Sequence, residues 1–224
     1  MSINIDEIDS VDSFCDDVRA LAARGDLDAA LSGVIAFAAG FIEQEATWAT
    51  VLSSPELDDL CQELGKVSPH LKTGDADPDA TVFVVTAVAG IGGHTRVLMD
   101  LVRADPGKNA TILVTNVEHS LTDEEVQNTL KNVGSSAKIE VATNLNCAER
   151  LRWLQDRLAD LRPARTYILQ HQFDAVIAAA LQPELVDKVI YFHNCDHNLA
   201  LGVHIRHFIH VDFNGKGYHQ CREQ

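Results

Sequence analysis

The stretch Thr81–Arg96, TVFVVTAVAGIGGHTR, decides the fold. Its first seven residues form a continuous apolar run rich in β-branched side chains, which is the pattern of a strand buried on both faces. Three glycines follow shortly afterwards, and the apolar spacing of Arg96–Arg103 then predicts a helix. A buried strand that turns through glycines into a helix is typical of an α/β domain built on a parallel sheet.

The chain beyond residue 96 repeats this alternation of strand and helix. Short apolar runs predict further strands at Ala110–Thr115, Lys138–Val141, Thr166–Leu169, Lys188–Phe192 and Phe208–Val211. Helical spacing lies between most of them, at Asp123–Lys131, Ala148–Leu161 and Phe173–Leu181. We therefore predict a Rossmann-like α/β domain with a mainly parallel sheet. Ligands bind at the carboxyl ends of the strands in such sheets, so we expect functional side chains in those loops.

The first third of the chain predicts a small all-helical module, residues 1–75. Apolar residues recur at spacings of three and four from Val11 to Leu21, Asp26 can cap a second helix, and Ser54-Pro55 is a typical start for a third. The segment LAARGDLDAAL, residues 21–31, is similar to the turn of tetratricopeptide-like helix pairs, although no full repeat is evident. Polar residues up to Ala80 predict a linker at 76–80, with the α/β domain at 81–224.

The charge of the protein is strongly negative and unevenly distributed. The net charge of the 224 residues is −15, and residues 1–80 hold 17 acidic against 4 basic side chains. A protein with this charge and no basic stripe is a poor candidate for binding nucleic acid or an anionic membrane. The asymmetry also favours a boundary between two modules near residues 75–80.

The sequence also predicts where the protein resides. No apolar run approaches the roughly 18–20 residues needed to span a bilayer. The start, MSINIDEIDS, is acidic and lacks the features of a signal peptide. Five widely spaced cysteines without a CxxC pair fit reduced thiols better than a disulfide framework. We therefore expect a cytoplasmic protein without a membrane span.

The glycine-rich turn after the first strand is the first candidate for ligand binding. Gly92 and Gly93 would allow a close backbone approach, and the N–H groups of the following helix favour an anionic group. His94 and Arg96 would place a possible base and a cation at the same edge of the sheet. The turn is neither a P-loop nor a full dinucleotide fingerprint, because Thr95 stands where a third glycine is needed. A purely structural turn remains the alternative.

Two later loops carry histidines directly after predicted strands. His171 follows the Thr166–Leu169 run and could be a general base, a ligand of sugar hydroxyls or a helix cap. The segment YFHNCDHNLALG, residues 191–202, places His193, Asp196 and His197 after the next strand. In a parallel sheet these side chains would line the same cleft as the glycine-rich turn.

The density of histidines near the end of the chain raises the question of a metal site. His204, His207, His210 and Asp212 extend the group around His193, and histidine and aspartate are good ligands for zinc or iron. The spacing argues against it, because the HExxH motif is absent and the histidines alternate with apolar residues, so at least one should face inward from a strand. We predict no metal, and a metal-dependent hydrolase using this His/Asp cluster remains an alternative.

Two short motifs resemble those of a known superfamily. The turn GIGGHTR resembles the turn after the first strand in the N-terminal domain of GT-B glycosyltransferases. The stretch FHNCDHNLALGV resembles an HADH…LG segment of bacterial members, some of which carry tetratricopeptide-like helices at the N-terminus. His193, Asp196, His197, Leu201 and Gly202 match that segment. The resemblance covers residues 81–222.

The resemblance implies an acceptor-side domain that transfers a sugar from a nucleotide-sugar donor to a carbohydrate or glycoconjugate acceptor. It implies His197, His193 or His171 as the base, with Asp196 orienting a histidine or binding sugar hydroxyls. Gly92, Gly93 and His94 would admit the donor phosphates, and Arg96 would add charge. GT-B enzymes are usually metal-independent and need no cofactor besides the nucleotide-sugar co-substrate. A second domain binds the donor in that family; it has no counterpart in these 224 residues, so we expect little turnover from this chain alone. A non-catalytic interaction module, with the acidic helices as a docking surface, is a third possibility.

Overall fold

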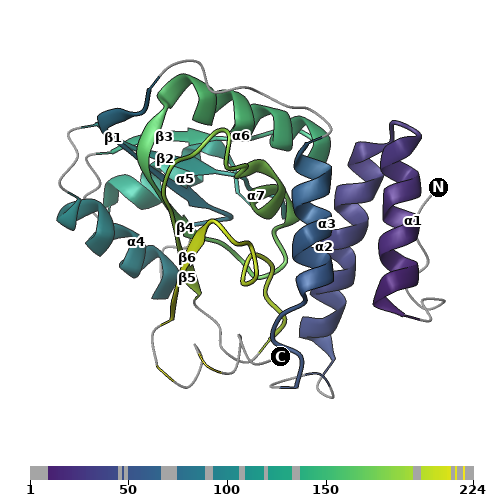
Figure 1. The fold of residues 1–224 in the computed structure, drawn as a ribbon. Coiled ribbons are helices and arrows are strands. Elements are labelled where there is room, and N and C mark those ends of the chain that lie inside the picture. The colour runs from purple at the N-terminus through teal and green to yellow at the C-terminus, as the bar shows by residue number, and fades with distance from the viewer. Residues whose placement is uncertain are drawn as a thin grey trace.

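A six-stranded, all-parallel sheet forms the centre of the protein (Figure 1). The computed structural model describes residues 10–44, 47, 50–66, 75–88, 93–105, 109–118, 121–132, 137–193, 198–212, 215 and 219. The strands are β1 (Asp77–Val85), β2 (Asn109–Val114), β3 (Lys138–Val141), β4 (Pro163–Leu169), β5 (Val189–His193) and β6 (Phe208–Asp212). Their order in the sheet is β3-β2-β1-β4-β5-β6, so the predicted Rossmann-like α/β class is confirmed.

Seven helices accompany the sheet in the described part of the chain. Three precede it, α1 (Val11–Ala23), α2 (Leu27–Glu43) and α3 (Pro55–Gly65). Four lie between strands, α4 (Gly93–Ala104), α5 (Asp123–Asn132), α6 (Cys147–Leu161) and α7 (Ala175–Ala180). The predicted caps at Asp26 and Ser54 are confirmed, because each side chain accepts a hydrogen bond from a backbone N–H in the first turn of its helix.

Strand order reverses between β1 and β4, which marks the topological switch point of the sheet. From β1 the chain continues outward to β2 and β3, and then returns to β4 on the other side of β1. The strands end level with each other, since Val85 of β1 is paired with Val114 of β2 and with Leu169 of β4. Side chains immediately after these three residues therefore gather at one point, the usual ligand position of an open parallel sheet.

The two faces of the sheet are covered by different helices. Val82 and Val84 of β1 pack into a large apolar cluster with α6, α7 and the three N-terminal helices. Phe83 and Val85, which alternate with them, pack into a smaller cluster with α4 and α5. The alternation follows from the pleat of the strand, and both faces are buried as the continuous apolar run predicted.

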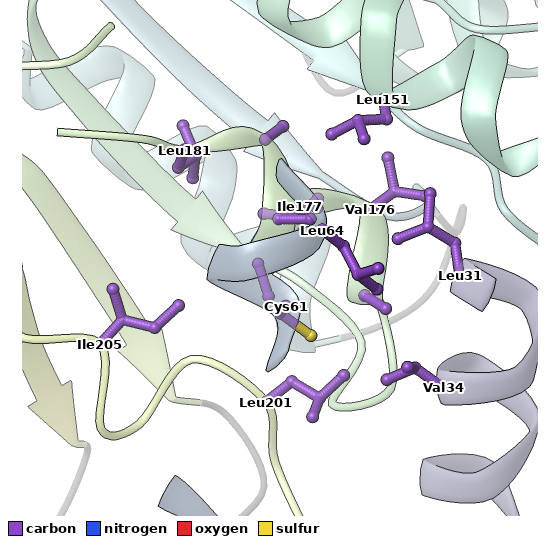
Figure 2. Packing of buried hydrophobic residues seen from close by; sticks show 14 of the residues in the cluster. Leu31, Val34, Cys61, Leu64, Leu151, Val176, Ile177, Leu181, Leu201 and Ile205 are labelled. Carbon is purple, nitrogen blue, oxygen red and sulfur yellow. The ribbon is translucent and has the colours of Figure 1, made fainter. Parts of the chain in front are cut away.

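The N-terminal helices share one continuous core with the sheet domain. Figure 2 shows Leu31 and Val34 of α2 and Leu64 of α3 directed at Val176 and Ile177 of α7. Helix α3 approaches α7 so closely that a Cβ added at Gly65 would overlap the carbonyl oxygen of Ala179 and the side chain of Gln182. In Figure 1 the three helices lie side by side along one flank of the sheet domain. The position of the domain boundary stays a prediction.

The first strand begins earlier than its composition predicted. Residues 77–80, predicted as linker, form the start of β1. The Asp77 N–H donates to the Arg162 carbonyl at 2.8 Å, and Asp77 is paired with Pro163 of β4 ahead of a register shift. Backbone pairing with a neighbouring strand overrides the polar, turn-forming composition of this segment, which periodicity alone could not reveal.

Two further findings concern the described residues as a whole. None of their helices is long and apolar enough to cross a membrane. Cys15, Cys61 and Cys147 are free thiols and are buried. Burial raises the pKa of the Cys15 thiol to about 11 and that of the Cys61 thiol well above its ordinary value. These thiols are therefore packing groups and not reactive nucleophiles at neutral pH.

Candidate functional site

Three ionisable side chains meet where the strand order reverses. His94 stands at the start of α4, Glu118 in the loop after β2 and His171 directly after β4. The His171 Nδ1 lies 3.3 Å from a Glu118 carboxylate oxygen, and the rings of His94 and His171 have centroids 5.9 Å apart. His171 and Glu118 are 28% and 38% exposed, so the site is partly shielded but open to solvent. We call these three residues the switch-point group.

The pKa values of the two histidines in this group are shifted in opposite directions. The hydrogen bond to Glu118 raises the pKa of His171, against the opposing effect of burial. Burial lowers the pKa of His94, and the charge on His171 lowers it further. The same hydrogen bond to His171 lowers the pKa of Glu118. At neutral pH the site therefore holds a neutral His94 beside an imidazole whose partner is a carboxylate.

A buried hydrogen-bond network fixes the backbone beneath His171. Its N–H donates to the Thr86 hydroxyl oxygen at 2.9 Å, and the Thr86 hydroxyl donates to Asp174 at 2.8 Å. Thr115 donates to the same Asp174 oxygen at 2.6 Å. The second Asp174 oxygen accepts from the Ile177 N–H at 3.1 Å and so caps α7. Three strand ends, β1, β2 and β4, are thus tied to one carboxyl group.

Asp174 is wholly buried, and its surroundings have two opposing effects on its pKa. Burial raises the pKa of this carboxyl group, while its three hydrogen-bond donors oppose the increase. The described donors satisfy both of its oxygens, so Asp174 serves to hold the strand ends together. It positions His171 through Thr86 and is itself 0% exposed.

The loop that carries Glu118 is closed by an asparagine in the left-handed region. Asn116 has φ 49°, a conformation that asparagine tolerates better than most residues. Its amide donates to the Leu121 carbonyl at 2.7 Å and accepts from the Leu121 N–H at 3.3 Å. This double contact spans residues 116–121 and sets where Glu118 leaves the sheet.

In the glycine-rich segment, Gly93 and Arg96 contribute less to the site than their residue types suggest. Gly93 begins α4, and a Cβ added there would meet open space, so packing by the protein does not require a glycine at this position. The Arg96 side chain is 79% exposed and pairs with Asp100 at 3.3 Å along the outside of α4. Gly92 lies outside the described residues. The structure therefore gives Arg96 a surface ion pair as its observed partner.

A second group of ionisable side chains lies on the last two strands. His193 is paired with Asp212 across β5 and β6, and Tyr191 with His210. The His193 Nδ1 lies 3.2 Å from one Asp212 oxygen, and the His210 Nε2 lies 2.9 Å from the other. The three side chains are 1%, 0% and 2% exposed for His193, His210 and Asp212. We call them the β5–β6 triad.

Leu201 and Gly202 of the LALG segment have a structural role in this fold. Asp58 of α3 accepts hydrogen bonds from the Gly202 N–H at 2.5 Å and from the His204 N–H at 2.7 Å. Gly202 has φ 101°, where a side chain would be strained, and Leu201 is fully buried. Burial raises the pKa of Asp58 to about 7, although both backbone donors oppose the increase. This contact anchors the 198–205 segment to the N-terminal helices.

The structure assigns the described residues that the sequence placed in one cleft to two groups. His94 and His171 are brought together, whereas His193 lies in the buried triad with His210 and Asp212. His197 and Asp196 lie outside the described residues. The expectation that a late histidine faces inward from a strand is confirmed by His210, while His204 and His207 bond to Ser53 and to the Leu181 carbonyl.

Sequence reasoning missed Glu118, Thr86 and Asp174. Glu118 follows the predicted second strand within four residues of its last strand residue, so a survey of polar residues after every strand would have included it. Thr86 was read as part of an apolar run, and Asp174 as part of a helix. Their contacts join positions 59 and 88 residues apart, which no local pattern encodes.

A hollow lies at the opposite edge of the sheet. It has a volume of about 680 Å³ and lies at the amino ends of β1 to β3, where Asp105, Arg103 and Lys138 contribute to its lining. None of the switch-point residues borders it. We place the functional site at the carboxyl edge, because that is where α/β sheets bind ligands and where the paired ionisable groups lie.

Comparison with known proteins adds no family assignment. No protein-family model matches the chain, and a search of curated proteins finds no match. The chemical role of the site is therefore inferred from its geometry. A carboxylate next to the His171 Nδ1 favours the tautomer whose Nε2 can accept a proton, which is the arrangement of a general base with an orienting partner.

Proposed function

We propose that this chain is the acceptor-side part of a GT-B-type glycosyltransferase, with His171 as the base and Glu118 as its orienting partner. The observation that carries the proposal is the His171–Glu118 pair, placed where the strand order reverses and next to the neutral ring of His94. The sequence resemblance supports it through the glycine-rich turn and the segment that follows β5.

The reaction would proceed by direct displacement at the sugar. The acceptor hydroxyl passes its proton to the His171 Nε2 while its oxygen forms a bond to the anomeric carbon of the donor. The bond from that carbon to the donor phosphate breaks, and its electron pair leaves with the nucleotide diphosphate. Glu118 stabilises the imidazolium that results, which accounts for a raised His171 pKa.

His94 and Phe173 complete the acceptor side. His94 is kept neutral by burial and can accept a hydrogen bond from a second sugar hydroxyl. The ring of Phe173 packs edge-on against His171, with centroids 5.7 Å apart, and provides an apolar wall. A polar pair beside an apolar wall suits a sugar, which has hydroxyls at its rim and C–H groups on its faces.

Carbohydrate binding by the 1–224 chain tests this proposal. Histidine-labelled protein would be titrated with a panel of mono- and disaccharides and, separately, with UDP-sugars, and followed by NMR. We expect at least one saccharide to shift the His94 and His171 signals while leaving the His207 signal in place. His171→Ala and Glu118→Ala should weaken that saccharide at least about tenfold.

His207→Ala is the matched control, because His207 is half-buried, bonded to the Leu181 carbonyl and placed at the amino end of β6, at the opposite edge of the sheet from His171. It should bind like the unmodified protein. If no saccharide moves the His94 and His171 signals, the proposed acceptor site is wrong. Turnover of a nucleotide sugar by this chain alone would contradict the part of the proposal that assigns donor binding to a second domain.

A further inference from the structure

The β5–β6 triad has the composition and the arrangement of a metal site. His193, His210 and Asp212 project from the same face of two adjacent strands, because His193 pairs with Asp212 and His210 stands two residues before it. Their ligand atoms all lie within 4.8 Å of one another. Two imidazoles and one carboxylate form a donor set that binds divalent first-row transition metals.

We propose that this triad binds a divalent transition metal ion, with zinc as its best-suited occupant. The carboxylate of Asp212 faces both rings, one oxygen 3.2 Å from the His193 Nδ1 and the other 2.9 Å from the His210 Nε2. One oxygen of Asp212 and one nitrogen from each ring can bind the ion. The three side chains therefore offer three protein donors, the number found in zinc sites whose fourth position is taken by water or another ligand.

The distances are close to those that an ion requires. Zinc binds nitrogen and oxygen at about 2.0–2.2 Å, so donor atoms around it lie about 3.4 Å apart. Two of the three separations, 3.2 Å and 2.9 Å, are already near this value. The third lies within 4.8 Å and closes by up to about 1.4 Å through rotation of the histidine side chains. Calcium and magnesium are disfavoured because they prefer sites made of oxygen ligands.

Burial gives the site a structural character and not a hydrolytic one. All three side chains are at most 2% exposed, and the ring of Tyr191 lies beside both imidazoles, with centroids 6.0 Å from His193 and 5.5 Å from His210. An ion there would crosslink β5 to β6, the strand at the edge of the sheet. It would stabilise the carboxyl end of the sheet without contacting a substrate.

The zinc content of the purified chain tests the proposed metal site directly. The 1–224 chain, freed of any histidine tag, would be stripped with EDTA, dialysed against micromolar zinc and analysed by mass spectrometry. We expect about one zinc per chain, and a loss of affinity of at least about tenfold in Asp212→Asn and His210→Ala. Cobalt in place of zinc should give visible absorption bands in the unmodified chain and not in Asp212→Asn.

Two controls make the result specific to the triad. His207→Ala removes a half-buried histidine near β6, and His171→Ala removes the switch-point imidazole; both should keep full zinc uptake. Asp212→Asn preserves the shape of the side chain, and zinc should raise the unfolding temperature of the unmodified chain but not of this variant. That comparison holds even if His210→Ala fails to fold.

Zinc uptake that is absent from the unmodified chain, or that is unchanged in Asp212→Asn, would overturn the proposal. The outcome is independent of the proposed sugar transfer, since metal content is measured at the triad and carbohydrate binding at His94 and His171. A chain that binds zinc but no saccharide would support the zinc site at the triad and contradict the proposed acceptor site.

Discussion

The switch-point group and the β5–β6 triad use the same residue types in opposite surroundings. Each has two histidines and one carboxylate at the carboxyl ends of parallel strands. In the first, His171 and Glu118 are 28% and 38% exposed; in the second, no side chain exceeds 2%. Water can exchange protons with the first group and is excluded from the second. Burial, and not residue identity, therefore decides whether such a cluster handles protons or holds strands together.

Removing the carboxylate from each group should have very different effects on stability. In EDTA-treated protein, Asp212→Ala removes the partner that two buried rings share and should lower the free energy of unfolding by about 3–5 kcal/mol. Glu118→Ala breaks a partly exposed pair and should lower it by less than about 1 kcal/mol. Urea denaturation of both variants measures the contrast. Equal losses would show that burial does not separate the two groups.

Helix α3 packs tightly against α7, the helix that Asp174 caps. Gly65→Ala places a methyl group into the backbone of α7 and should lower the free energy of unfolding by about 3 kcal/mol. Gly40→Ala, in the last turn of α2, meets open space and should raise it by up to about 0.5–1 kcal/mol. Hydrogen exchange would show whether Gly65→Ala loosens β4 and β5 together. Loosening of α1–α3 alone would mean that the helical module unfolds separately from the sheet.

The buried Asp58 carboxyl group makes the free energy of unfolding depend on pH. Its folded pKa of about 7 lies above the ordinary value of 3.8, so the folded state retains a proton that the unfolded state loses. This contribution to stability is complete below about pH 4 and is lost as the pH rises to 7, at up to about 1.4 kcal/mol per pH unit. Comparing thermal unfolding of Asp58→Asn with the unmodified chain from pH 4 to 8 isolates it. A parallel pH dependence in the two proteins would rule out Asp58 as its source.

The smallest predicted effect is the separation of two pKa values within the switch-point group. NMR titration should place the His171 pKa above 6.5 and the His94 pKa below it. Glu118→Gln should lower the His171 pKa, because it removes the carboxylate that stabilises the imidazolium. Stability from the His171–Glu118 pair is present between the folded pKa values of the two groups: it is lost as the pH falls through that of Glu118 and as it rises through that of His171. An unchanged His171 pKa in Glu118→Gln would show that the pair does not form in solution.

Much of the fold was predictable because its information is local. The continuous apolar run from Thr81, the capping side chains of Asp26 and Ser54, and the alternation after residue 96 each reflect contacts within one element. The strand at Lys138–Val141 was predicted to the residue. The start of β1 at Asp77 was not, because it depends on pairing with β4, more than 80 residues away.

The sequence alone determined the α/β class, the three N-terminal helices and two of the histidines that meet at the site, His94 and His171, since each follows or begins a recognisable element. Only the tertiary structure decided which ionisable groups face each other. It joined His171 to Glu118, placed Asp174 under three strand ends and moved His193 into a buried group with His210 and Asp212. The physical reason is that strand order and register, which set these pairings, arise from packing between distant segments of the chain.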